Sequence, residues 1–142
     1  MVHKMSRLFL HILITLTSMN SFASGDLEYS KCVKAQDESK LDEAISFCSA
    51  AVEHGHIGAK LTLGHIYFNK KKPDFELATK WYRDFAESDI EGYQYGFAML
   101  GHVAFKQDKY NEAMKWYMLC NKSPYKGCKS SINRLKNYIK IK

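Results

Sequence analysis

The stretch Leu63–Ile66, LGHI, recurs as Leu100–Val103, LGHV, at a spacing of 37 residues. A second stretch, Ala78–Tyr82, ATKWY, recurs as Ala113–Tyr117, AMKWY, at a spacing of 35 residues. A weaker copy of this second stretch begins at Ala44, 34 residues before the first of its two strong copies. A period near 35 residues is typical of a repeat protein in which each copy is one supersecondary unit.

Each copy predicts two helices. In the second copy, apolar residues recur at helical spacing from Ala59 to Tyr67 and again from Leu77 to Phe85, with a helix breaker at Pro73 between them. The third copy repeats both apolar stripes, and the alternation typical of strands is absent from the sequence. We therefore predict an all-α fold, a short α-solenoid of about three helix-turn-helix repeats followed by a C-terminal capping helix.

The predicted capping helix follows the third copy. Ser123 and Pro124 form a typical helix start, because Ser caps the first turn and Pro fits the first helical position. Apolar residues then recur from Cys128 to Ile139, opposite a face rich in lysine and arginine. We interpret this basic face as solvated, and a binding patch is the alternative interpretation.

Small residues mark a close approach of the two helices within each copy. Gly64 and Gly101 lie inside predicted helices, where Gly costs about 1 kcal/mol relative to Ala. We expect tight helix packing to offset this cost, with Ala78 and Ala113 as the small residues of the facing helices. The aromatic residues that follow these alanines are interpreted as core packing rather than as a ligand site.

The N-terminus predicts a secretory signal peptide over residues 1–23. Two basic residues precede an apolar run from Leu8 to Leu16, and small residues surround a cleavage site after Ala23. An uncleaved membrane anchor is the alternative, but the apolar run is well short of the roughly 20 residues that a span needs. We expect a mature domain over residues 24–142, without membrane attachment after cleavage.

All four cysteines lie in the expected mature part: Cys32, Cys48, Cys120 and Cys128. An even number of cysteines in an exported chain favours disulfides and a periplasmic or secreted location. Zinc is the alternative, but neither close pair has the short spacing of a metal knuckle. The formal net charge of +6 for the whole chain bears mainly on solubility, and we expect no nucleic-acid partner.

The layout Leu-Gly-x-x-Tyr followed by Ala-x-x-Trp-Tyr resembles the Sel-one-like repeat, a relative of the tetratricopeptide repeat. The resemblance spans residues 27–142. It is carried in the second and third copies by Ala59, Leu63, Gly64, Tyr67, Ala78, Trp81, Tyr82, Leu100, Gly101, Ala113, Trp116 and Tyr117. Ala104 departs from the pattern, because it stands where the second copy has a tyrosine.

The resemblance implies a pairing of the cysteines. In the first copy, Cys32 stands at the Gly position and Cys48 at the second aromatic position, and in this repeat family those positions lie on facing helices. The resemblance therefore implies a disulfide Cys32–Cys48. It also implies Cys120–Cys128, because that pair is similar to the arrangement in cysteine-rich secreted members of the family. Cysteine number alone leaves three pairings open.

No motif in the sequence predicts catalysis. His-Glu-x-x-His and a glycine-rich phosphate loop are both missing from the sequence. His54 and His56 offer two imidazoles without an evident third metal ligand. We therefore predict no catalytic residue, no metal site and no cofactor. Some cysteine-rich members of the resembled family are described as β-lactamase-like, so a cell-wall-acting enzyme stays an alternative.

Stacked helix pairs offer an extended surface, usually lined by the first helix of each unit. We predict that a monomeric chain uses this surface to bind a peptide or protein. Plain solvent exposure is the alternative for any one of these residues, and an immunity protein or a secreted virulence or host-interaction factor is a second hypothesis for function. The predicted partner-binding residues are Lys60, Thr62, His65, Asn69, Phe97, Met99, His102 and Lys106.

Overall fold

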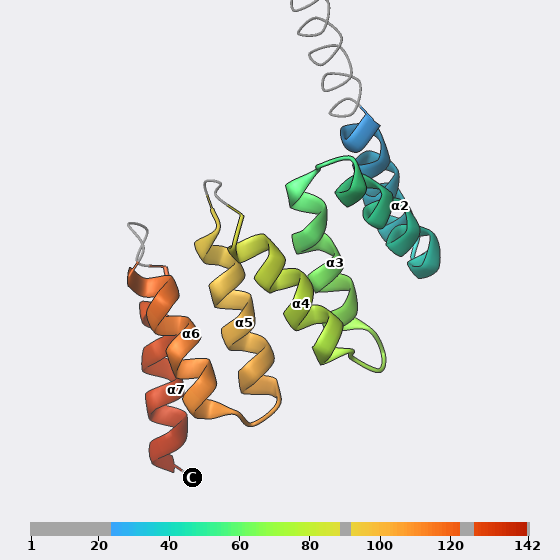
Figure 1. The fold of residues 1–142 in the computed structure, drawn as a ribbon. Coiled ribbons are helices and arrows are strands. Elements are labelled where there is room, and N and C mark those ends of the chain that lie inside the picture. Colours follow the sequence, from blue (N-terminus) through green and yellow to red (C-terminus); the bar gives the residue numbers. More distant parts are fainter. Residues whose placement is uncertain (1–23, 89–91, 123–126, 142) are drawn as a thin grey trace, which may run out of the picture. The chain divides into compact units, whose positions relative to one another are not determined.

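The structure, a computed structural model, describes residues 24–88, 92–122 and 127–141. Within these ranges the backbone forms helices and the turns between them, without a strand, which confirms the predicted all-α repeat fold (Figure 1). No helix in the described ranges has the length and apolar character needed to cross a membrane. The predicted signal peptide over residues 1–23 and the predicted helix start at Ser123 and Pro124 lie outside the described residues.

The helices follow one another as hairpins. Residues 24–37 form a helix that precedes α2. The later elements are α2 (Leu41–Glu53), α3 (Ile57–Asn69), α4 (Phe75–Ala86), α5 (Gln94–Lys106), α6 (Tyr110–Lys122) and α7 (Lys129–Ile141). The chain divides into two compact units, Met1–Ala59 and Lys60–Lys142. In the second unit, α5 packs against both α4 and α6, and α6 packs against α7.

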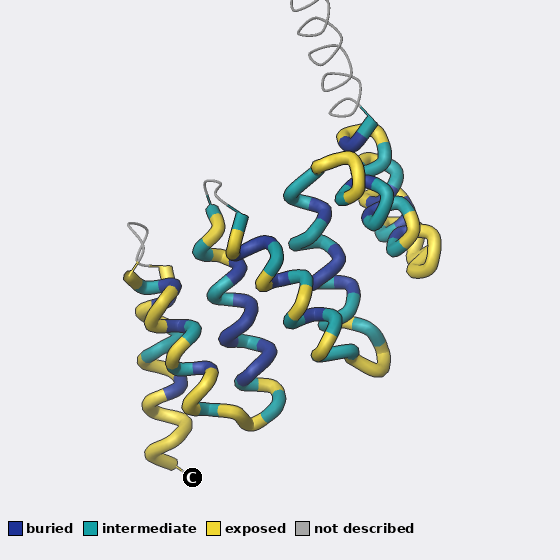
Figure 2. The backbone as a smooth tube through the Cα atoms, in the orientation of Figure 1, coloured by how far each residue is buried: buried dark blue, intermediate teal, exposed yellow. Residues whose placement is uncertain are grey.

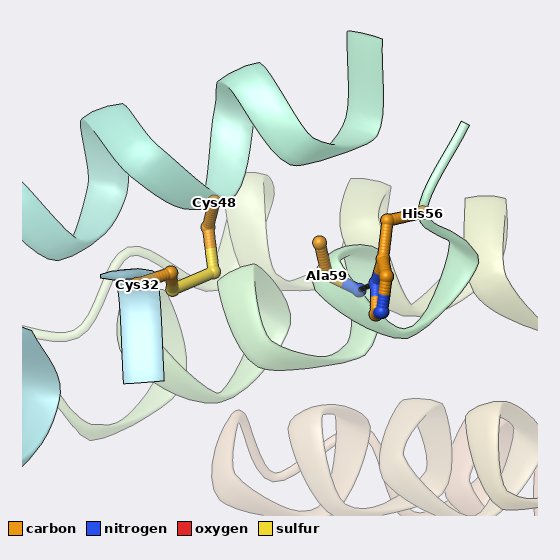
Figure 3. The surroundings of a disulfide bond; sticks show 4 residues. All are labelled: Cys32, Cys48, His56 and Ala59. Atoms are coloured by element: carbon orange, nitrogen blue, oxygen red, sulfur yellow. Dashed lines mark hydrogen bonds between the residues drawn. A yellow bond between two sulfur atoms is a disulfide. The ribbon is translucent and has the colours of Figure 1, made fainter. Parts of the chain in front are cut away.

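The first hairpin, made by residues 24–37 and α2, is closed by a disulfide. Cys32 and Cys48 are bonded across the hairpin, with their Cα atoms 5.1 Å apart, and both side chains are fully buried (Figure 3). Ala44 and Ala51 on α2 are also fully buried. Small buried residues let the two helices approach closely, so the disulfide takes the place of a bulky core side chain.

The second and third hairpins are closed by a glycine against a tyrosine ring. A Cβ atom added at Gly64 would lie 2.5 Å from the ring of Tyr82, and a Cβ atom at Gly101 would overlap the ring of Tyr117. Both tyrosines are buried in the core. The close approach predicted from the two glycines is therefore confirmed, and each glycine makes room for the aromatic ring of the facing helix.

The turn between α3 and α4 is fixed by Asp74. Its backbone N–H donates to the Tyr67 carbonyl at 2.9 Å, and its side chain accepts a hydrogen bond from the Leu77 N–H at 3.0 Å. A side-chain acceptor at this position satisfies one of the free N–H groups at a helix start, which stabilises the helix by about 1 kcal/mol. The turn thus ends α3 and starts α4 within a few residues.

The capping helix α7 is held by a second disulfide and by one buried leucine. Cys120 and Cys128 are bonded, with Cα atoms 5.8 Å apart, and Leu135 packs into the same core cluster. The predicted apolar stripe is buried only as far as Leu135, because Ile139 is exposed. Figure 2 shows that the C-terminal end of α7 is exposed. Disulfides of this kind indicate an oxidising, extracellular environment.

Candidate functional site

Lys60, the first residue of the predicted partner-binding stripe, is engaged with α4. Its ammonium group donates to the Asp84 carbonyl at 3.3 Å and lies 3.5 Å from the Ser88 hydroxyl. The last four carbonyls of a helix lack partners within the helix, and a cation is favourable there because of the helix dipole. Lys60 therefore stabilises the end of α4.

His65 and His102 lie at equivalent places in successive hairpins. Each packs edge-on against the tyrosine of its hairpin, at 5.5 Å from Tyr82 and 5.6 Å from Tyr117 between ring centroids. Burial lowers the pKa of both histidines, and the positive charge of Arg134 lowers the pKa of His102 further. Since an unperturbed histidine titrates near pH 6.5, both side chains are neutral at pH 7.

Met99 does not lie on an exposed face as predicted, because only 7% of its surface is exposed. It belongs to the core cluster that contains Ala78 and Tyr82. The prediction placed Met99 on an exposed face of its helix, and that placement is wrong because α5 is covered by neighbours on several sides. Figure 2 shows how much of α5 is buried in the folded chain.

The other predicted residues are spread over different surroundings. Phe97 is half-buried and stacks on Trp116, with ring centroids 6.0 Å apart. Thr62 is half-buried, while Asn69 and Lys106 are exposed at the ends of α3 and α5. The structure therefore brings His65 and His102 into matching roles but does not gather all eight residues into one surface.

A hollow of about 390 Å³ lies between α4 and α6, with α5 beneath it. We call it the α4–α6 groove; Figure 1 shows α5 running between the other two helices. An α-helix turns about 100° per residue, so the groove contacts a different face of α5 from the one that carries His102. Its lining residues are Phe75, Glu76, Thr79, Lys80, Arg83, Leu100, Val103, Ala104, Gln107, Lys109, Glu112 and Trp116.

The floor of the α4–α6 groove is apolar and its rims are charged. Leu100, Val103 and Ala104 form the floor and are almost fully buried in the free chain. Lys80 on the α4 rim already pairs with a carboxylate, since its ammonium group lies 3.1 Å from Asp84 Oδ2. Charged rims around an apolar floor are typical of sites in which polar groups orient a partner that buries an apolar side chain.

Trp116 is held in place from three sides. Phe97 stacks on its ring, and the Arg83 guanidinium lies 6.0 Å from the ring centroid. The indole N–H donates to Glu112 Oε1 at 3.3 Å. A ring that is already fixed loses little conformational freedom when a partner covers it, so Trp116 is suited to be an anchor of a binding site.

Trp116 packs against the core as a partly buried side chain, as predicted, but the α4–α6 groove beside it was not predicted. A signal was present, because Glu76, Lys80 and Arg83 recur at helical spacing on α4. Lys109, Glu112 and Trp116 recur in the same way along α6 and its preceding turn. The sequence could not show that these two polar stripes face each other across α5, since that depends on how the two hairpins pack.

His56, one of the two histidines considered as metal ligands, acts as a helix cap in the first unit. Its Nδ1 accepts a hydrogen bond from the Ala59 N–H at 3.1 Å, as Figure 3 shows. Its ring stacks on Tyr29 at 4.0 Å, and its Nε2 lies 3.7 Å from Asp26 Oδ1. Among the described residues, no group of three or more histidine, cysteine or acidic side chains is arranged to hold a metal ion.

Comparison with protein-family models and with curated protein sequences finds no match. The resemblance to Sel-one-like repeats therefore depends on the motif residues of the chain itself.

Proposed function

We propose that this chain is an exported Sel-one-like repeat scaffold whose α4–α6 groove binds an extended segment of a partner protein. The observation that carries the proposal is the groove itself, in which a fixed Trp116 and a charged Arg83 border an apolar floor. Its volume of about 390 Å³ falls in the range of ligand pockets, roughly 300–1,000 Å³. This volume suits a few side chains of an extended segment.

The chemistry of the groove selects one kind of segment. An apolar side chain in the groove would pack beside the half-buried rings of Phe75 and Trp116. Arg83 presents a planar fork of donors, which matches a carboxylate. The proposed partner segment therefore carries a bulky apolar residue with an acidic residue next to it.

Export is supported by the two disulfides and by the signal-like N-terminus. Disulfides persist in the periplasm and outside the cell, whereas thiols stay reduced in the cytosol. The proposed location is the periplasm or the surrounding medium, where a small scaffold gains stability from two covalent links.

The proposal is for binding rather than catalysis. Among the described residues that line the groove, none is a serine, cysteine or histidine. The carboxylate of Glu112 already accepts the hydrogen bond of the Trp116 indole. This rim therefore serves to fix the aromatic anchor, and the repeat supplies a surface for a monomeric scaffold.

Photo-crosslinking from two positions tests the proposal. A photoreactive amino acid replaces Thr79, which lines the groove, or Lys136, an exposed residue on α7. Illumination of the exported protein in its native envelope should give an adduct with one partner from position 79 and none with that partner from position 136. Equal adducts from both positions, or none from position 79, would refute the groove as the binding site.

A further inference from the structure

A second hollow, of about 90 Å³, lies among α5, α6 and α7. We call it the α5–α7 recess. Two of its lining residues, Phe105 and Leu135, are apolar. The other four carry polar or charged groups, and they are His102, Tyr117, Ser131 and Arg134.

The polar groups of the α5–α7 recess are mainly hydrogen-bond donors. Arg134 carries a guanidinium group whose N–H groups only donate, and the hydroxyl groups of Tyr117 and Ser131 can both donate. Burial raises the pKa of Tyr117 to about 12, although the charge of Arg134 lowers it in part. Tyr117 therefore keeps its proton at neutral pH. Among the described residues that line the recess, none is acidic.

At the same place in the preceding hairpin, no charged side chain of the described residues contributes to the lowered pKa of His65. There, His65 packs edge-on against Tyr82 in the same way, but its second aromatic neighbour is Tyr95, at 6.2 Å. Within the described part of the chain the Tyr82 hydroxyl is buried without a hydrogen-bond partner. Helix α7 follows α6 as α5 follows α4, and the capping helix brings Arg134 beside the His102–Tyr117 pair.

We propose that the α5–α7 recess binds a small oxyanion, a carboxylate or a phosphate group, through Arg134 and the hydroxyls of Tyr117 and Ser131. The guanidinium fork forms paired, charge-assisted hydrogen bonds to such oxygens. A volume of about 90 Å³ is several times the roughly 10–15 Å³ that a cavity needs to hold one water molecule. The recess therefore has room for one small oxyanion group.

The test is a titration of the oxidised mature domain with inorganic phosphate and, separately, with acetate. Backbone amide NMR shifts of α5 and α7 report binding, and sodium chloride at matched ionic strength is the control for general screening. We expect saturable shifts around His102 and Arg134 with at least one of the two anions. Saturation with phosphate alone identifies a phosphate site, and saturation with acetate identifies a carboxylate site. Shifts no larger than those in sodium chloride, for both anions, would overturn the proposal.

Three variants separate a built site from surface charge. Arg134→Gln should weaken anion binding by at least about tenfold, because it removes a charge-assisted contact. Tyr117→Phe keeps the buried ring and removes only the hydroxyl, so it should weaken binding by about three- to tenfold. Lys136→Gln removes an exposed charge from the same helix and should change binding less than about twofold.

Equal weakening by Arg134→Gln and Lys136→Gln would show nonspecific attraction and would contradict the proposal. Circular dichroism and thermal unfolding of each variant check that the fold is intact. Arg83→Gln, which alters the α4–α6 groove, should leave anion binding unchanged. The oxyanion site and the proposed partner groove can therefore fail separately.

Discussion

Cys32 and Cys48 are bonded at the two positions that Gly64 and Tyr82 occupy in the next hairpin. In the first hairpin, a covalent link thus stands where the later hairpins have an aromatic ring packed on a glycine. Gly101 and Tyr117 repeat the noncovalent version. The same pair of helix positions therefore closes each hairpin by one of two different means.

Removing the first disulfide should destabilise the chain. The bond links residues separated by 16 positions, and a loop of that size corresponds to about 3 kcal/mol in the chain-entropy model. The Cys32→Ala/Cys48→Ala variant should lose about that much free energy of unfolding, measured by urea denaturation. The Cys120–Cys128 bond closes a shorter loop, so the matched Cys120→Ala/Cys128→Ala variant should lose about 2.5 kcal/mol. An unchanged urea midpoint in the first variant would show that the bond does not stabilise the fold.

Gly64→Ala should destabilise the second hairpin, although alanine favours a helix by about 1 kcal/mol over glycine at an exposed site. The added methyl group would overlap the Tyr82 ring, and such overpacking costs about 1–3 kcal/mol. Thermal or urea unfolding measures the effect. In a Tyr82→Leu background the ring is absent, so the same substitution should cost less. An equal cost in both backgrounds would argue against a direct contact between position 64 and the ring.

The chain should lose stability on mild acidification because of His65 and His102. Burial lowers the pKa of both histidines in the folded state, so the unfolded chain binds more protons than the folded chain below about pH 6.5. The free energy of unfolding should be level above this pH and should fall as pH decreases through it, until the folded-state pKa values are passed. Urea unfolding at pH 7.5 and pH 5.5 measures the change.

The matched variant for this pH effect is His65→Gln/His102→Gln. It should show a smaller decrease in the free energy of unfolding between the two pH values than the natural chain. Its absolute stability can differ, because only the pH-dependent difference reports the titration of these imidazoles. The same decrease in both proteins would assign the pH effect to other groups.

Lys60→Met should lower stability by about 0.5–1.5 kcal/mol, because the ammonium group bonds to a terminal carbonyl of α4. Lys136→Met is the matched control, since Lys136 is exposed in the middle of α7, and surface substitutions of this kind change stability by less than about 0.5 kcal/mol. Urea denaturation of both variants makes the comparison. An equal loss in both would contradict a specific role for Lys60.

The hairpins could be predicted from the sequence because their signals are local. Helical spacing of apolar residues and the matching Gly64 and Gly101 define each helix pair before any packing is known. The environment of Met99 could not be predicted in the same way. Spacing shows which residues share a face of a helix, but not which neighbouring helix covers that face.

The binding surface depends on packing between hairpins and was therefore predicted only in part. His102 was identified from its repeat position, but Arg134 reaches the same recess from α7, and no local pattern links the two residues. Trp116 was interpreted as core packing together with the other aromatic residues that follow Ala78 and Ala113. Its contact with Arg83 depends on the distance between α4 and α6 across α5.

The most direct test of the partner groove is the affinity of the cross-linked partner for purified variants of the oxidised mature domain, measured by calorimetry. Arg83→Glu and Trp116→Ala should each weaken binding by at least about tenfold, as expected for anchor residues. Lys136→Glu, on exposed α7 surface, should change the affinity less than about threefold. If both groove variants fold normally by circular dichroism and bind the partner with the same affinity as the unsubstituted domain, the account is contradicted.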